Sequence, residues 1–240
     1  MGSGGAAFAE YTLADHGRLF RAPSNMNFEE AASLPVALAT MHNAVVTNGA
    51  LQAGQTVLIQ GASSGVGLMA MQIAKYKGAK TVIGSSTDPM RRSRLKEFGA
   101  DLAVDSSDPG WVDEVLKATG GEGVDLIVDQ VSGPVANQNL KATKVKGRIV
   151  NVGRLGGFKG EFDFDLHAMK RIDYIGVTFR TRSVEEVREI VRLMRADLWG
   201  HVESGKLKLP IDRTFPLDKA AEALAHMRAN AHFGKIALVV

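Results

Sequence analysis

Thr56-Val-Leu-Ile-Gln-Gly61-Ala-Ser-Ser-Gly65-Val-Gly67-Leu-Met-Ala-Met-Gln-Ile-Ala-Lys75 is the stretch of sequence that decides the fold. An apolar run of β type leads into a glycine-rich turn, and the turn leads into a run with helical periodicity. Glycines allow a tight turn and a close approach of the backbone to a phosphate group. The helix that follows offers unpaired N–H groups and a positive dipole at its N-terminus. This order predicts a nucleotide-binding turn at residues 61–67.

The sequence after Gln55 alternates short β-rich runs with helical runs. Runs such as Val124-Asp-Leu-Ile-Val are largely apolar, as expected when helices cover both faces of a parallel sheet. We therefore expect an α/β fold with a doubly wound, six-stranded parallel Rossmann sheet. The expected strands are 56–60, 80–84, 101–105, 124–129, 147–152 and 173–178, and the expected helices are 66–77, 89–98, 111–119, 134–143 and 184–199, with a loop and a short helix within 153–171.

Both ends of the chain differ from this middle part. Short strands are expected within residues 6–22, at 211–215 and at 234–240, without crossovers of β-α-β length between them. We interpret the ends as parts of a second, smaller and mostly β unit.

The composition is that of an ordinary globular protein. Of 240 residues, 45% are hydrophobic, and 29 Lys and Arg stand against 26 Asp and Glu. So small an excess of positive charge does not indicate a nucleic acid or a membrane as partner. The absence of cysteine excludes disulfides, thiolate nucleophiles and cysteine-bound zinc. The start of the chain has no signal-peptide pattern, and no run of apolar residues is long enough to cross a membrane, so we expect a soluble cytoplasmic protein.

The spacing of the glycines also occurs in short-chain dehydrogenases, which need a Tyr-x-x-x-Lys pair. The chain has one such pair, Tyr76 and Lys80, inside or just after the helix that follows the turn. From there it cannot reach the mouth of the sheet, so short-chain chemistry is not expected.

The residues after the second expected strand indicate which nucleotide binds. An NAD site usually has an acidic residue there, for the ribose hydroxyls. Here the sequence reads Gly84-Ser85-Ser86-Thr87, and three arginines follow at 91, 92 and 94. A guanidinium pairs well with a 2′-phosphate, so we predict NADPH, with Arg91 as the ion partner. The alternative is that these arginines form a solvated helix face.

Several motifs together resemble the zinc-independent quinone oxidoreductases of the medium-chain dehydrogenase/reductase superfamily, which are related to zeta-crystallin. The resemblance covers nearly the whole chain. It implies that most of an N-terminal, GroES-like substrate domain is missing here, and it divides the chain into a remnant of that domain (1–34), an NADP-binding domain (35–206) and the C-terminal part of the substrate domain (207–240). The motifs are Ala9-Glu-Tyr11, Phe28-Glu-Glu-Ala-Ala-Ser-Leu-Pro35, Leu51-Gln-Ala-Gly-Gln-Thr-Val-Leu-Ile59, the glycine turn, Gly120-Gly-Glu-Gly-Val-Asp125, Gly147-Arg-Ile-Val-Asn-Val-Gly153 and Phe233-Gly-Lys-Ile236.

The same resemblance implies roles for individual residues in the cofactor site. Gly61 and Gly67 belong to the turn itself. Without the resemblance, Thr40 could equally be a helix residue that bonds its own backbone, and Phe179 a core residue. The implied contacts are Thr40 near the nicotinamide, Ser64, Gly65 and Val66 on the pyrophosphate, Ser85, Ser86 and Arg91 on the adenosine phosphate, and Val152, Gly153 and Phe179 beside the nicotinamide end.

No metal is expected. In zinc-dependent relatives a cysteine ligand lies a few residues before the threonine, and Val36 holds that place here. His42 and His167 are isolated histidines without carboxylates at ligand spacing, which are more often structural or exposed.

The resemblance implies an NADPH-dependent transfer of a hydride to a quinone or to the β-carbon of an α,β-unsaturated carbonyl. The sequence names no catalytic residue. Two alternatives stay open: a non-catalytic NADPH-binding module, and the enoyl-reductase domain of a larger synthase. The run Asp173-Tyr-Ile-Gly-Val-Thr-Phe179 is expected at an open edge of the sheet, where a second copy could pair, so a homodimer is predicted.

Overall fold

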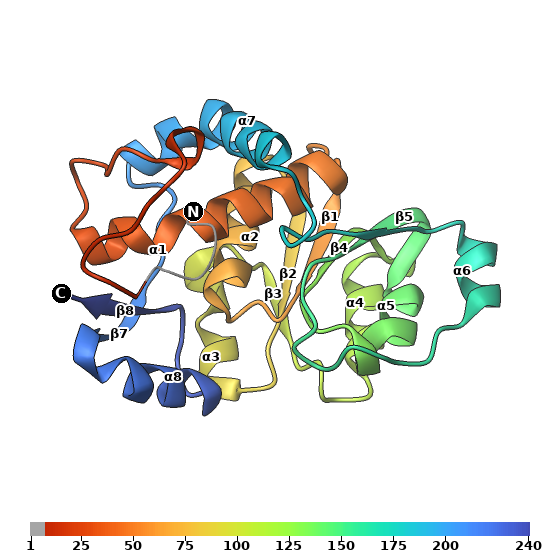
Figure 1. Ribbon diagram of the computed structural model, residues 1–240. Helices are drawn as coiled ribbons and strands as arrows, with labels where there is room; N and C mark the ends of the chain where they lie inside the picture. Colours follow the sequence, from red (N-terminus) through yellow and green to blue (C-terminus); the bar gives the residue numbers. More distant parts are fainter. Residues whose placement is uncertain (1–7) are drawn as a thin grey trace.

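A six-stranded parallel sheet forms the centre of the computed structural model, which describes residues 8–240 (Figure 1). The strand order is β3-β2-β1-β4-β5-β6, so the first strand, β1, lies in the middle of the sheet and the later strands lie on both sides of it. The predicted doubly wound Rossmann sheet is confirmed. Its strands are β1 (Thr56–Gln60), β2 (Thr81–Ser85), β3 (Leu102–Val104), β4 (Val124–Asp129), β5 (Thr143–Asn151) and β6 (Asp173–Gly176).

Helices cover both faces of this sheet (Figure 1). The alternation of side chains along β1 shows how the two faces are used, since successive strand residues point to opposite sides. Val57 and Ile59 belong to one buried cluster with the residues of α1, α2 and α7, whereas Leu58 belongs to the other with Trp111 of α4. The helices are α1 (Phe28–Met41), α2 (Gly65–Tyr76), α3 (Pro89–Ser93), α4 (Trp111–Ala118), α5 (Ala136–Ala142), α6 (Phe164–Lys170) and α7 (Val184–Glu203).

Two of the expected helices differ in detail from the structure. The helix expected at 89–98 is an α-helix only to Ser93 and continues as the 3₁₀ helix η3 (Leu95–Phe98), which ends at Gly99 in the left-handed region. The helix expected at 134–143 consists of the 3₁₀ helix η4 (Gly133–Val135) followed by α5. Thr143 already belongs to β5, and its hydroxyl donates to the Asn139 carbonyl at 2.7 Å, closing the end of α5.

Two helical segments before β1 were not expected from the sequence. α1 begins with a capping box, in which the Asn27 side chain and the Glu30 side chain each accept from the other residue's backbone N–H. The π-helix η2 (His42–Asn48) continues directly from α1. The expected helix at 184–199 is confirmed as α7, with Ser183 as its cap, and it runs on to Glu203.

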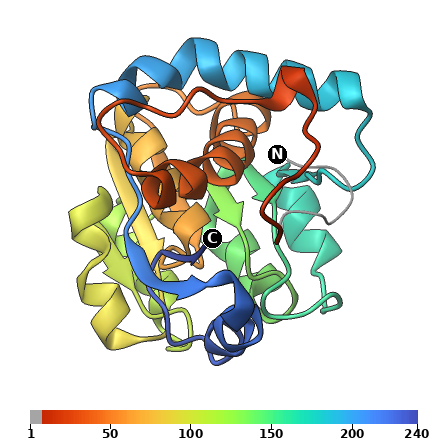
Figure 2. The ribbon, with the colours of Figure 1, turned by 60° about the vertical axis from the view of Figure 1, so that its left-hand side comes forward.

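The N-terminal segment is not a strand in the part that the structure describes. Residues 8–22 run as irregular chain with one 3₁₀ turn, η1 (His16–Arg18), so the prediction of short strands within 6–22 is wrong for these residues; residues 6 and 7 lie outside the described part. The side chains of Tyr11 and Leu13 are 89% and 93% exposed. β-type residues need a neighbouring strand to form a ladder, and none lies beside this segment among the described residues. The segment instead passes along α7 (Figure 2).

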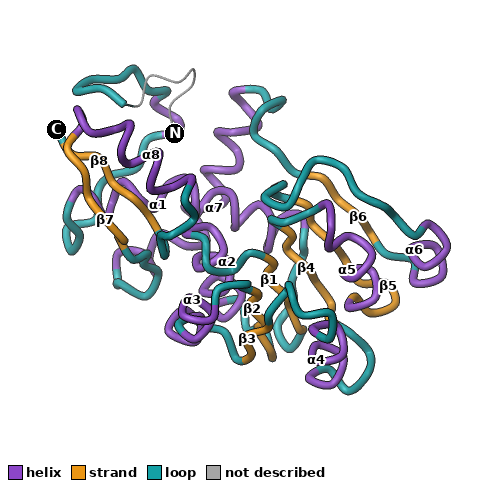
Figure 3. Tube along the Cα trace, turned by 90° about the horizontal axis from the view of Figure 1, so that it is seen from below, coloured by secondary structure: helices purple, strands orange, loops and turns teal. Residues whose placement is uncertain are grey.

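The C-terminal segment forms a separate two-stranded sheet beside the larger one (Figure 3). β7 (Ile211–Pro216) and β8 (Lys235–Val239) confirm the two expected strands. The expectation of no crossover is wrong, because the 3₁₀ helix η5 (Leu217–Lys219) and α8 (Ala220–Arg228) connect them. The strands are parallel, and a parallel pair requires such a connection.

Candidate cofactor site

The glycine turn joins β1 to α2 as the sequence predicts. Gly61 lies in the left-handed region with φ of +72°, which glycine adopts without strain. Ser64 caps α2, because its Oγ accepts a hydrogen bond of 3.0 Å from the N–H of Gly67. A Cβ at Gly67 would lie 2.6 Å from the Gly61 carbonyl oxygen, so the first turn of α2 packs directly on the backbone of the turn. The turn therefore has the tight geometry that a phosphate-binding loop needs.

Gln130, which follows β4, holds the turn from the side of the neighbouring strand. Its Nε2 donates to the Gln60 carbonyl at 3.2 Å, and its Oε1 lies 3.0 Å from the Oγ of Ser64. The side chain of Gln130 is buried. Sequence reasoning did not single out this residue. Its position just beyond the carboxyl end of β4, the neighbour of β1, is the one signal that could have found it.

The two predicted serines after β2 also lie at the turn. The hydroxyl of Ser85 is fully buried; it accepts from the N–H of Gly61 at 3.1 Å and donates to Gln60 Oε1 at 2.6 Å. It thus supports the turn from inside the protein. Ser86 is also buried, and its Oγ donates to Ser63 Oγ of the turn at 3.1 Å.

Arg91 and Arg92 of α3, and Arg94 directly after it, do not form a freely solvated face. Arg91 Nη1 donates to Asn230 Oδ1 at 3.0 Å, and the Arg91 side chain is only 15% exposed. Arg92 Nη1 donates to the Ser86 carbonyl and to Asp105 Oδ2, both at 2.8 Å. Arg94 stacks on Phe233, with its guanidinium carbon 4.1 Å from the ring centre. The arginines therefore connect the end of β2 to the segment that precedes β8.

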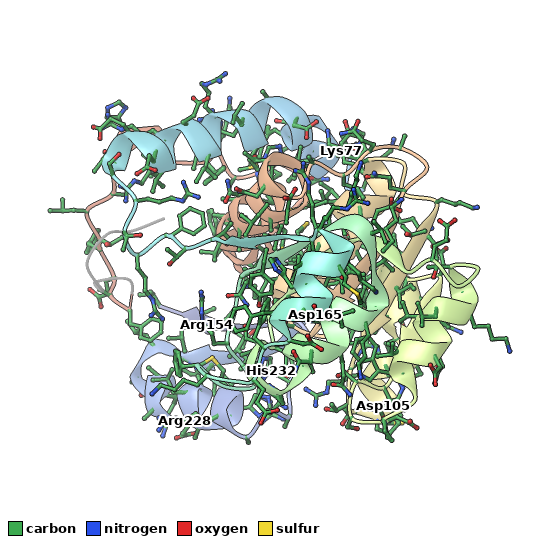
Figure 4. All side chains as sticks on the ribbon, turned by 90° about the vertical axis from the view of Figure 1, so that its right-hand side faces the viewer. Lys77, Asp105, Arg154, Asp165, Arg228 and His232 are labelled. Carbon is green, nitrogen blue, oxygen red and sulfur yellow. The ribbon has the colours of Figure 1, made fainter. Side chains whose placement is uncertain are left out.

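A cavity of about 400 Å³ opens at the same edge of the sheet, beyond β5 and β6. It brings together the four residues predicted near the nicotinamide: Thr40 from α1, Val152 and Gly153 after β5, and Phe179 after β6. Arg154 and Arg180 also line it, and its lining contains no carboxylate (Arg154 is labelled in Figure 4).

Leu155 connects this cavity to the glycine turn. It lines the cavity, and its Cδ1 lies 3.7 Å from the position that a Cβ on Gly61 would occupy. On the backbone side, a Cβ at Gly153 would lie 2.7 Å from the carbonyl oxygen of Gln130, which itself holds the turn. The turn and the cavity therefore lie next to each other at the carboxyl ends of the strands, where ligands bind in open α/β sheets.

A buried polar network fixes the floor of the cavity. Ser132 lies in the left-handed region with φ of +59° and donates through its Oγ to the Gly153 carbonyl at 2.7 Å. Asn151 donates to the same hydroxyl oxygen. Asp129 Oδ1 accepts from the N–H groups of Val131 and Ser132 at 2.8 and 2.9 Å, and burial raises the pKa of this carboxyl above its usual range. The strained turn at Ser132 is thus tied down by several partners.

Both histidines considered as metal ligands have structural surroundings. His42 Nε2 lies 3.1 Å from Asp197 Oδ2, the same carboxylate that pairs with Lys77 at 2.6 Å, and burial lowers the pKa of His42. The ring of His167 packs on Phe162, with the ring centres 5.3 Å apart. Within residues 8–240, no three His, Asp or Glu side chains gather where they could hold a metal ion.

Known proteins share both the sequence and this architecture. The family model described as zinc-binding dehydrogenase matches residues 65–196, which is more than half of the chain. The quinone oxidoreductase of Homo sapiens is 30% identical over 221 residues, which cover 92% of this chain and 64% of that protein. The chain belongs to the medium-chain dehydrogenase/reductase superfamily.

Two further proteins are similar to this chain. The erythronolide synthase EryA2 of Saccharopolyspora erythraea is 30% identical over 97% of this chain, which corresponds to 6% of the synthase. The crystal structure of an NAD-dependent alcohol dehydrogenase is 32% identical and superposes with a TM-score of 0.85, over 98% of this chain and 65% of that one. The predicted resemblance to quinone oxidoreductases is confirmed. The chain spans about two thirds of the length of the human relative.

Proposed function

We propose that this dehydrogenase/reductase binds NADPH across the glycine turn and the neighbouring cavity and passes a hydride to a quinone or an α,β-unsaturated carbonyl, without zinc. The observation that supports the proposal is that the glycine turn and the cavity lie next to each other. The turn offers the N-terminus of α2 for phosphates, and Leu155 and Gln130 connect it to a cavity of about 400 Å³. A dinucleotide has the same two-part form, with a diphosphate between its two nucleosides.

The side chains present fit a nicotinamide dinucleotide. Thr40, Val152, Gly153 and Phe179 line a cavity large enough for a nicotinamide ring and a small substrate beside it. When bound, the cofactor supplies the hydride. The protein then contributes orientation and exclusion of water, and the positive charges of Arg154 and Arg180 favour a substrate whose oxygen gains negative charge during the reaction.

The preference for NADPH over NADH rests on the end of β2. No carboxylate lies in Gly84-Ser85-Ser86-Thr87, and Asp88, the next residue, is occupied as the cap of α3. Arg91 is held beside this strand end by Asn230, and we propose that its positive charge pairs with the 2′-phosphate. The solved relative described as NAD-dependent makes NADH the alternative to be tested.

A titration followed by turnover tests this proposal. NADPH and NADH are titrated separately while nicotinamide fluorescence is recorded, and a simple quinone or enone is then added. We expect tighter binding of NADPH and its oxidation at a rate proportional to the protein. Loss of one charge-assisted contact costs about 1.5–3 kcal/mol, so Arg91→Ala is expected to weaken NADPH about tenfold to a hundredfold and to leave NADH unchanged. Arg195→Ala, on the exposed face of α7, is the control.

Two results would replace the proposal by its alternatives. NADPH binding without oxidation by quinones or enones would leave the cofactor-binding module. Oxidation of NADPH by enoyl thioesters but not by quinones would favour an enoyl reductase. The similarity to a large synthase supports this alternative. Equal effects of Arg91→Ala on both nucleotides would contradict the assignment of Arg91 to the 2′-phosphate.

We also propose that two copies pair through β6. This strand ends the sheet, with β5 on one side only, and Asp173, Tyr174 and Gly176 are exposed. An unpaired strand edge is a ready surface for a second copy, and a twofold axis there would join two sheets. Light scattering is expected to give the mass of a dimer at micromolar concentration.

One glycine of β6 allows a sharp test of this interface. A Cβ at Gly176 would meet nothing within 4 Å, so Gly176→Glu is compatible with the folded monomer but places like charges near the twofold axis. We expect this variant to be monomeric. Gly200→Glu, on α7 and equally free of neighbours, should remain dimeric. A monomeric wild-type protein would contradict the pairing.

The division of the chain into 1–34, 35–206 and 207–240 remains a proposal, and α1 crosses its first boundary. None of the helices in residues 8–240 is both long and apolar enough to cross a membrane. We propose a cytoplasmic location, to be checked by cell fractionation.

A further inference from the structure

The cavity beyond β5 and β6 changes from buried at its inner end to exposed at its mouth. Val177 at the inner end is buried, and Thr40 and Val152 are partly buried. The residues of the mouth are exposed; they are Arg154, Leu155, Phe158 and Arg180. A ligand in this cavity therefore has an inner end that is shielded from water and an outer end that meets two arginines.

Neither of these arginines is paired with a carboxylate. Within residues 8–240, no ion pair involves Arg154 or Arg180. Nη1 of Arg154 donates to the Val152 carbonyl at 3.3 Å, which leaves the charge of the guanidinium without a counter-ion (Arg154 is labelled in Figure 4). Arg182 differs from them, because it pairs with Glu186 at 3.5 Å. The two arginines of the mouth are thus free to bind an anion.

Carboxylates of the neighbouring segments are already engaged. Glu186 Oε2 accepts from the N–H of Ser183 at 2.8 Å as part of the cap of α7. Asp129, in the network under the floor, accepts through Oδ1 from two backbone N–H groups, and burial raises its pKa, which favours the uncharged form. The lining itself contains no carboxylate, so nothing in it opposes the binding of an anion at the mouth.

Apolar side chains lie beside these charges. Leu155 and Phe158 line the same mouth and are 74% and 81% exposed. Exposed apolar side chains at a cavity are a surface for an apolar ligand. A guanidinium binds a carboxylate or a phosphate through parallel hydrogen bonds. Together they suit a molecule that has an apolar body and a fixed anionic group, whereas a neutral quinone would use the apolar surface alone.

We propose that the substrate is an apolar quinone or enone that carries a fixed anionic group, a carboxylate or a phosphate, and that Arg154 and Arg180 bind this group at the mouth of the cavity. The inference rests on the proposed function, since it takes the inner end of the cavity to hold the nicotinamide and the reacting group. The anionic group then lies outward, and the reacting double bond lies inward beside Thr40 and Val152. The two arginines select the substrate by its charge.

A matched pair of enones tests this selection. Benzylideneacetone with a para-carboxylate is compared with its methyl ester, since the two share the reacting enone and differ in charge. We expect the wild-type kcat/KM to be about tenfold higher for the acid, mainly through KM, and this ratio to fall towards one in the double variant of Arg154→Gln and Arg180→Gln. An effect of the arginines on the charge that develops on the carbonyl oxygen is common to both compounds and cancels in the ratio. Arg195→Gln, an exposed arginine of α7, is the control and should keep the wild-type ratio. The para-phosphate, compared in the same way, shows which of the two anions is preferred.

The saturated analogue of the acid, which cannot accept a hydride, separates this inference from the proposed function. We expect the wild-type protein to bind it, measured by calorimetry, and the double variant to lose that binding while its thermal unfolding shows a folded protein. If the analogue binds through the arginines but no enone oxidises NADPH, the anion site stands and the proposed hydride transfer falls. The inference is overturned if the wild type reduces acid and ester equally well or does not bind the analogue. It is also overturned if the double variant weakens NADPH as much as it weakens the acid, since the arginines would then serve the cofactor.

Discussion

The six-stranded sheet and the two-stranded sheet of this protein are stabilised in different ways. Four of the five residues of β1 and five of the six residues of β4 are buried, because helices cover both faces. In β8 every residue is only partly buried. A two-stranded sheet is marginal by itself and depends on packing against other elements. α1 supplies part of that packing, since it contacts β7 and β8.

The apolar surface around the smaller sheet shows the same difference. A groove of about 780 Å³ lies between α1, α8 and β8, and Phe28 on its wall is 83% exposed. The larger sheet thus contains its own core, whereas the smaller one leaves apolar side chains accessible. We therefore expect the two sheets to respond differently to the same kind of substitution.

The largest expected difference is in the cost of removing a leucine from each sheet. Leu58→Ala deletes a fully buried side chain at the centre of β1 and is expected to lower the free energy of unfolding by about 2–5 kcal/mol. Leu238→Ala, in β8, removes a side chain that is already partly in water, so we expect a loss below about 1.5 kcal/mol. Urea unfolding of both variants measures this, and equal losses would show that the smaller sheet is as well packed as the larger one.

A smaller effect is expected at the glycines of two helices. Gly67→Ala forces a Cβ to within 2.6 Å of backbone atoms of the turn, so we expect a loss of about 1–3 kcal/mol together with weaker NADPH binding. Gly200→Ala on α7 meets no neighbour and should stabilise the protein by up to about 1 kcal/mol. Thermal unfolding with and without NADPH compares the two; a Gly67→Ala variant as stable as the wild type would argue against the tight turn.

The smallest expected effect concerns the pH dependence of stability at the floor of the cavity. Burial raises the pKa of Asp129 above its ordinary value of 3.8, so the folded state holds this proton more tightly than the unfolded state does. The stability that it contributes is present below that ordinary value and is lost as pH rises through the raised pKa of the folded state.

Asp129→Asn isolates this contribution, because asparagine can still accept from the backbone N–H groups at 131 and 132. As pH rises from about 4, the free energy of unfolding of the wild type should fall relative to that of the variant. Urea unfolding at a series of pH values measures it. A difference that does not change with pH would contradict the raised pKa.

The fold of the larger sheet follows from local rules that the sequence displays. The apolar runs of β1 and β4, the glycine turn and the alternation with helices are enough to predict the sheet, and four predicted residues of the nicotinamide end do line one cavity. Gln130 was missed because its place depends on which strands become neighbours. It follows β4, and its side chain donates to the Gln60 carbonyl at the end of β1.

The ends could not be predicted in the same way. Residues 8–22 have strand-like side chains, yet they form no ladder, because β structure depends on a partner strand. The alanine-rich run of α8 has weak amphipathic character and was not recognised as the crossover that makes β7 and β8 parallel.

We propose that the glycine turn and the cavity together bind one nicotinamide dinucleotide. The most direct measurement is a titration of the purified protein with NADPH, followed by the fluorescence of the nicotinamide ring, with adenosine as competitor. Saturable binding, with a change in fluorescence that shows the ring entering an apolar cavity, is the predicted result. No binding of either NADPH or NADH would contradict the account.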